Sequence, residues 1–111
     1  MGLDMYAYRQ AKNTAPVKFH YWRKHPNLHG WMENRWRDTG GEGEFNCVDL
    51  RLLPHDLDLL ERHVLSQSLP PTVGFFFGAS DPESMDDDLE FIATAREAIA
   101  NGESVTYSSW W

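Results

Sequence analysis

Residues 3–8, Leu-Asp-Met-Tyr-Ala-Tyr, form the stretch of this 111-residue chain that decides the fold. Leu3, Met5 and Ala7 lie on one side of the extended chain. Tyr6 and Tyr8 lie on the other side, which is the two-residue period of a β-strand. Three further stretches read as strands, namely 17–21, 46–52 and 104–110. We therefore expect a mostly antiparallel sheet of about four strands.

Three other segments have the spacing of helices. The first carries Pro26 in its first turn, where a missing N–H costs nothing. The second opens at Pro54, and the third begins near Asp81 or Ser84. Each segment has one apolar stripe that we expect to face the core. The stripes consist of Leu28, Trp31, Met32 and Trp36; of Leu57, Leu60, Val64 and Leu65; and of Met85, Leu89, Ile92 and Ile99.

The expected architecture is a single compact α+β domain over residues 1–111, with about three helices on one face of the sheet. Cys47 is expected to be a small core residue on a strand, and the apolar run 73–78 a buried strand or hairpin arm. Leu59 and Phe91 lie nearly opposite the stripes of their helices, so we expect them to be exposed. The predicted common core consists of Met5, Leu50, Leu57, Leu60, Phe76, Leu89 and Ile92.

The composition excludes several classes of protein. Hydrophobic residues make up 41% and aromatic residues 14% of the chain, which excludes a disordered chain. No apolar run approaches the roughly 20 residues of a membrane span. The start has neither the basic nor the apolar region of a secretory signal. A single cysteine excludes a disulfide framework, so we expect a protein of the reducing cytoplasm.

The charge is unevenly distributed along the chain. Its net value of −7 argues against direct nucleic-acid binding, which needs many cations. Residues 1–53 carry eight basic and six acidic residues, which gives +2, whereas residues 54–111 carry two and eleven, which gives −9. Such a dipolar surface can steer a partner. The acids can equally serve only to keep the protein in solution.

The acidic start of the third helix is the predicted partner-binding surface. Asp86, Asp87, Asp88 and Glu90 surround the aromatic ring of Phe91, and an aromatic anchor with a charged rim is typical of protein interfaces. In the alternative interpretation these acids are solvated and only stabilise the positive end of the helix dipole.

A second candidate is a ligand or anion site in the first half of the chain. Aromatic and basic side chains alternate there as in sites that stack bases and hold phosphates, although the same residues suit a strand-to-helix junction. The residues of this alternative site are Trp22, Arg23, Lys24, His29, Trp31 and Arg35. Arg35 and Arg96 fall inside apolar stripes, so each is expected to pair with a carboxylate, with Asp4 and Asp49 as candidates, to extend outward, or to bind an anion.

No catalytic signature or cofactor motif stands out. His25, His29 and Glu33 follow one another at intervals of four, but the spacing differs from the zinc-protease pattern. We expect packing and capping roles for the histidines and no metal or other cofactor. Cys47 has no neighbouring cation to lower its pKa, and the serines lie in no nucleophile elbow. An enzyme is therefore the less favoured interpretation.

Four motifs resemble a family of small phage and prophage proteins across nearly the whole chain. They are Gly2–Tyr6, Tyr21–Lys24 with His29 and Trp31 downstream, Gly74–Gly78 and Ser108–Trp110. Some members are labelled phosphoglycerate kinase, but this chain is far too short for that two-domain enzyme and has no phosphate-binding loop. The resemblance implies a phage or prophage context, in which small accessory proteins bind and disable host proteins, including CRISPR complexes.

These observations lead to two functional hypotheses. The first is a cytosolic, phage-derived binding protein that targets a host protein, such as a nucleic-acid-binding component of a defence system. The second is a small ligand-binding protein or enzyme with a pocket around Trp22, Arg23, His29, Trp31 and Arg35. A packed domain would favour the first hypothesis, and a deep aromatic pocket with convergent polar groups would favour the second.

Overall fold

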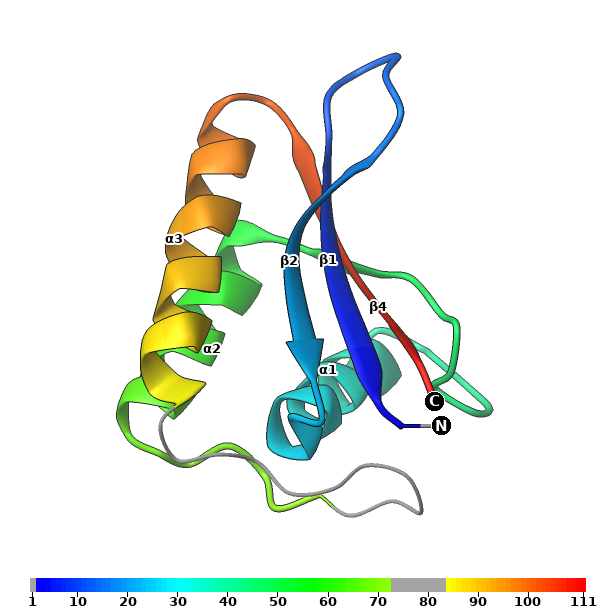
Figure 1. Ribbon diagram of the computed structural model, residues 1–111, viewed down its shortest axis with the longest axis vertical. Helices are drawn as coiled ribbons and strands as arrows, with labels where there is room; N and C mark the ends of the chain where they lie inside the picture. The colour runs from blue at the N-terminus through cyan, green and yellow to red at the C-terminus, as the bar shows by residue number, and fades with distance from the viewer. Residues whose placement is uncertain (1, 73–83) are drawn as a thin grey trace.

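The computed structural model describes residues 2–72 and 84–111 of the chain. Within them the chain forms a four-stranded antiparallel sheet and three helices, so the α+β prediction is confirmed (Figure 1). The elements are β1 (Asp4–Gln10), β2 (Val17–Arg23), α1 (Pro26–Asp38), β3 (Leu50–Leu52), α2 (Pro54–Leu65), α3 (Met85–Ala100) and β4 (Ser104–Trp110). The predicted strand at 73–78, its core residue Phe76 and the alternative helix start at Asp81 lie outside the described residues.

The sheet has the strand order β2-β1-β4-β3, and each neighbouring pair is antiparallel. The central strands β1 and β4 pair over their whole length, from Asp4 opposite Trp110 to Gln10 opposite Ser104. The register between β1 and β2 shifts near Tyr8, so Phe19 is an extra residue of a β-bulge. In Figure 1 the helices lie on one side of the sheet.

The alternation at residues 3–8 determines which face of the sheet is buried. Leu3, Met5 and Ala7 are fully buried, whereas Tyr6 and Tyr8 are only partly covered. On β4 the side chains of Val105 and Tyr107 are buried in the same way. The helices close over this face with Leu28, Trp31, Met32, Leu57, Leu60, Val64 and Ile92.

Two of the three helix starts follow the proline rule. Pro26 and Pro54 both stand at the first helical position. At the start of α2 the buried carboxylate of Asp56 accepts a hydrogen bond from the Leu53 N–H at 2.8 Å, which satisfies a donor that the helix itself cannot use. The first and second helices therefore begin where the sequence predicts.

The third helix turns a different side inward from the one predicted. Its buried residues are Asp88, Phe91, Ile92, Ala95 and Ala98, whereas Met85, Leu89 and Ile99 are only partly buried. The prediction that Phe91 is exposed is therefore wrong. The reason is that the stripe includes an aspartate, which a hydrophobicity pattern assigns to the surface.

Three smaller expectations are also corrected. Cys47 is exposed and has a positive φ of 58°, because strand β3 begins only at Leu50 and the preceding residues turn. Leu65 is 57% exposed, since it occupies the last position of α2, beyond the covered part of the stripe. Leu59 is half-buried and packs against the core.

Leu60 tests the packing of the core. Its side chain is fully buried, and truncation of a buried leucine leaves a cavity. We expect Leu60→Ala to lower the free energy of unfolding by about 2–5 kcal/mol, measured by urea titration. Leu65→Ala, on the exposed end of the same helix, is the control and should change stability by less than about 0.5 kcal/mol. Equal midpoints for the two variants would contradict the assignment of Leu60 to the core.

Candidate functional site

The acidic start of α3 is largely used within the molecule. Asp88 is buried, and its carboxylate accepts hydrogen bonds from the Trp22 indole at 3.1 Å and pairs with His25 at 2.8 Å. Asp87 pairs with His20 at 2.9 Å. These contacts fasten α3 to β2 and to the residue that precedes α1. Of the four acids predicted to meet a partner, only Asp86 and Glu90 are exposed.

The predicted aromatic anchor is not available to a partner. Phe91 is fully buried. Its ring stacks on Phe19, with centroids 5.7 Å apart, and meets the edge of Trp22 at 4.8 Å. The bulge in β2 turns Phe19 toward α3, and this supplies the surface on which the ring packs. The predicted partner-binding surface of Asp86, Asp87, Asp88, Glu90 and Phe91 is therefore corrected.

The residues of the alternative ligand site lie in three separate places. Trp22 and His29 are buried under the sheet, whereas Arg23 and Lys24 are exposed where β2 ends. This matches the strand-to-helix interpretation of the aromatic–basic stretch. Trp31 and Arg35 line a groove of about 260 Å³ between α1 and α2, away from the other four. The six residues do not form one pocket.

The groove between α1 and α2 is held by internal contacts. Its lining residues include Trp31, whose indole N–H donates to His63 Nδ1 at 2.8 Å. Arg35 donates to the buried carboxylate of Asp56. The polar groups that could orient a ligand are therefore used to bring the two helices together.

Both arginines inside the apolar stripes pair with carboxylates, as one of the three expectations stated. Arg35 binds Asp56 and Arg96 binds Glu61 and Asp58, at 2.8 and 2.7 Å. The predicted partners Asp4 and Asp49 are wrong, because both arginines face α2 and not the sheet. Asp4 instead accepts a hydrogen bond from the Tyr21 hydroxyl at 2.6 Å.

The cluster around His25 has the residue types of a catalytic triad but not its geometry. Ser84 Oγ lies 3.3 Å and Asp88 2.8 Å from the same ring nitrogen, Nε2. A triad needs the serine and the carboxylate on opposite nitrogens of the ring, so that the base is free to take the serine proton. His25 therefore links Asp88 to the start of α1 and does not activate Ser84.

The three residues of the possible metal set are separated in the structure. His25 binds Asp88, His29 binds the Tyr107 hydroxyl at 2.7 Å, and Glu33 pairs with Arg37. Among residues 2–72 and 84–111, no group of three or more His, Cys, Asp or Glu side chains is arranged to hold a metal ion. Within the same ranges, no helix has both the length and the apolar composition to cross a membrane.

His29 makes the stability of the fold depend on pH. Burial lowers its pKa from 6.5 to about 4, against a smaller opposing effect of Glu33. As the pH falls below 6.5, the unfolded chain binds this proton before the folded chain does, so stability is lost between pH 6.5 and 4. We expect this group to remove about 2 kcal/mol between pH 7 and pH 5. Urea titrations should show a flatter pH profile for His29→Gln, and parallel profiles would contradict the assignment.

The face of the sheet opposite the helices carries a cluster of tyrosines. The alternation of the strands turns Tyr6 and Tyr8 of β1 and Tyr21 of β2 to this side. The Tyr6 ring lies 5.4 Å from Tyr21 and 6.3 Å from Tyr8, and the Lys18 ammonium lies over the rings of Tyr6 and Tyr21. We call this surface the tyrosine face; its residues are Asp4, Tyr6, Tyr8, Gln10, Lys18, Tyr21, Arg23, Arg51, Ser104, Thr106, Ser108 and Trp110.

Large aromatic side chains are exposed on the tyrosine face. Trp110 is 66% and Tyr21 46% exposed. The pKa of Tyr21 is raised, chiefly because its hydroxyl donates to Asp4, so this phenol stays protonated near neutral pH. The rings are held by their neighbours, and they present an ordered aromatic surface to solvent.

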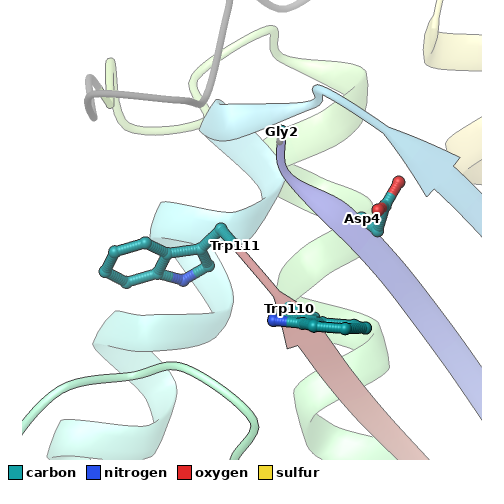
Figure 2. Close-up of a pocket in the computed structure, with 4 residues that line it drawn as sticks. All are labelled: Gly2, Asp4, Trp110 and Trp111. Carbon is teal, nitrogen blue, oxygen red and sulfur yellow. The ribbon is translucent and has the colours of Figure 1, made fainter.

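Three hollows follow one another along β1 and β4 on the tyrosine face. The first, of about 290 Å³, is lined by Gly2, Asp4, Trp110 and Trp111. Figure 2 shows its two indole rings pointing away from each other at the end of β4. The second, of about 280 Å³, is lined by Tyr8, Gln10, Pro16, Asp49, Thr106 and Ser108. The third, of about 250 Å³, is lined by Gln10, Ala11, Lys12, Asn13, Arg51, Gly102 and Ser104.

Sequence reasoning did not identify the tyrosine face as a site. The alternation placed Tyr6 and Tyr8 away from the core, so part of the signal was present. Neither the antiparallel pairing of Tyr6 with Tyr21 nor that of Asp4 with Trp110 could be read from one strand alone. The cluster arises only when the first, second and last strands come together.

Comparison of the chain with protein-family models, with curated proteins and with solved structures gave no match, so the site is interpreted from its own residues.

Proposed function

We propose that this chain is a binding protein and not an enzyme, and that it acts on a host protein in the bacterial cytoplasm through the tyrosine face. The observation that carries the proposal is the exposed aromatic surface formed by Tyr21, Trp110 and their neighbours. Tyr, Trp and Arg are the residues most enriched among those that dominate binding energy at protein interfaces.

The composition of the tyrosine face suits a protein partner. Tyrosine and tryptophan provide large contact area at low entropic cost, and serine provides adaptable hydrogen bonds, as in antibody binding sites. The face combines such aromatic rings with the hydroxyls of Ser104, Thr106 and Ser108. It leaves Trp110 largely uncovered, and exposed apolar surface of this kind marks interaction sites.

The hollows favour side-chain contacts over a small-molecule substrate. Each measures about 250–290 Å³, below the roughly 300–1,000 Å³ of ordinary ligand pockets. The only serine–histidine–carboxylate cluster that we find in the described residues, at Ser84, lacks the geometry of a triad. A shallow face with several small hollows is suited to the side chains of another protein.

The resemblance to small phage and prophage proteins suggests the class of partner. Phage accessory proteins act on host proteins, and components of defence systems, including CRISPR complexes, are among their targets. The host protein is therefore the partner that we propose, and the tyrosine face replaces the acidic start of α3 as the contact surface.

A capture experiment tests the proposed function. The tagged chain is incubated with lysate of phage-infected bacteria, and stoichiometric partners are identified by mass spectrometry and then purified. We expect Trp110→Ala and Tyr21→Ala each to weaken binding of the purified partner about thirtyfold, or by about 2 kcal/mol.

Leu65→Ala is the matched control, because Leu65 is also an exposed apolar residue but lies on α2. It should bind like the unmodified chain, and all three variants should keep its melting temperature. Loss of binding in an Asp86→Asn/Glu90→Gln variant, with full binding in Trp110→Ala, would overturn the proposal and return the contact surface to α3. Absence of any stoichiometric partner would also contradict it.

A further inference from the structure

The cations of the chain fall into two groups with different positions. Arg9, Arg35, Arg37 and Arg96 each pair with a carboxylate. In the part of the chain that the structure describes, no ion pair is formed by Lys12, Lys18, Arg23, Lys24, Arg51 or Arg62. Five of these six lie on β2, on β3 or in the turns that follow β1 and β2, and Arg62 alone lies on a helix. Unneutralised positive charge therefore collects around the sheet.

The exposed carboxylates of the helices lie away from the tyrosine face. Asp58 is on α2, and Asp86, Glu90 and Glu97 are on α3. Both helices pack on the opposite side of the sheet (Figure 1). The tyrosine face contains one carboxylate, Asp4, which Tyr21 engages, and Asp49 lines the second hollow. An acidic partner is therefore repelled by the helices and attracted to the sheet.

The three hollows define a path along β1 and β4. The path runs from Trp110 at one end, past Tyr8, to Arg51 at the other end. Strands of seven residues are about 20 Å long, which matches about six residues of an extended peptide. Both edges of β1 and of β4 are already paired, so such a segment cannot add to the sheet as a strand. It would lie across the face and place side chains in the hollows.

We infer that the tyrosine face binds an extended acidic segment of its protein partner, which lies along β1 and β4 between Arg23 on one side and Arg51 on the other. This inference rests on the proposed function and adds the chemistry of the partner. Carboxylates of the segment meet the unpaired guanidinium groups of Arg23 and Arg51, which can hold them with two hydrogen bonds each. Its apolar side chains pack on Trp110 and Tyr8.

A protein segment fits the face better than a single-stranded nucleic acid does. Stacking of bases needs open ring faces, but Lys18 lies over Tyr6 and Tyr21, whose rings also pack against each other. Closely spaced phosphates would also meet the carboxylates of Asp4 and Asp49. A peptide can place its acids only where the arginines are.

Three labelled probes test the inference by fluorescence anisotropy. One is a peptide of about twelve residues composed of Glu, Ser and Leu, the second has Lys at every Glu position, and the third is an oligothymidylate of about twelve nucleotides. At low ionic strength we expect the Glu peptide to bind at least tenfold more tightly than either of the others. Its affinity should fall as salt is added, because the contacts are between charges.

Charge reversals locate the site. Arg23→Glu and Arg51→Glu should each weaken binding of the Glu peptide at least tenfold. Arg62→Glu makes the same change in net charge on α2 and should weaken it less than threefold. Tighter binding of the Lys peptide or of the oligothymidylate would overturn the inference, as would equal losses in Arg62→Glu and Arg51→Glu.

The captured partner separates this inference from the proposed function. If its binding is lost in Trp110→Ala but is unchanged in Arg23→Glu, in Arg51→Glu and at high salt, the acidic segment is wrong and the tyrosine face remains the contact surface. If its binding is unchanged in Trp110→Ala, the proposed function itself fails.

Discussion

Asp88→Ala should lower the free energy of unfolding by about 3–5 kcal/mol, the typical cost of removing one member of a buried ion pair. The carboxylate of Asp88 is 2% exposed and serves two donors at once, the indole of Trp22 and the imidazole of His25. Removal of the carboxylate leaves both donors buried without this acceptor, and each such loss costs about 1–3 kcal/mol. Urea titration followed by circular dichroism measures the change.

Asp86→Ala is the matched control for this prediction. Asp86 lies two residues earlier in the first turn of α3 and is exposed, so its loss should cost only about 0.3–1 kcal/mol through the helix dipole. Equal unfolding midpoints for the two variants would show that the contacts of Asp88 do not hold α3. A simultaneous neutralisation of Asp86, Asp87, Asp88 and Glu90 would therefore perturb the fold as well as the surface charge.

The order of the elements could be predicted from the sequence because the two periods are clear in most of the segments. The strand at residues 3–8 alternates strictly, and Pro26 and Pro54 mark two helix starts that the structure contains. The inward side of α3 could not be predicted in this way. A hydrophobicity pattern assigns Asp88 to the surface, but Trp22 and His25 bring it into the interior from distant positions in the chain.

The candidate site was harder to predict than the fold. The sequence indicated that Tyr6 and Tyr8 face away from the core, but one strand cannot show what lies beside it. The tyrosine face depends on which strands become neighbours, since Tyr21 and Trp110 reach it from β2 and β4. The acids of α3 were misleading for the opposite reason, because local clustering gave no sign that Asp87 and Asp88 have partners in β2 and at the start of α1.

Phe91→Ala should lower the free energy of unfolding by about 3–5 kcal/mol, as expected when a fully buried phenylalanine is truncated. The ring of Phe91 is 0% exposed and packs between Phe19 and Trp22, so its loss opens a cavity between α3 and β2. Glu90→Ala, which removes the exposed neighbouring side chain, should change stability by less than about 0.5 kcal/mol. Chemical denaturation distinguishes the two variants, and kinetics with the captured partner provide a second test. The fraction of Phe91→Ala that remains folded should dissociate from the partner at the rate of the unmodified chain, because a ring inside the core cannot touch the partner. Faster dissociation with undiminished stability would instead make Phe91 an exposed anchor of the interface and would contradict its burial.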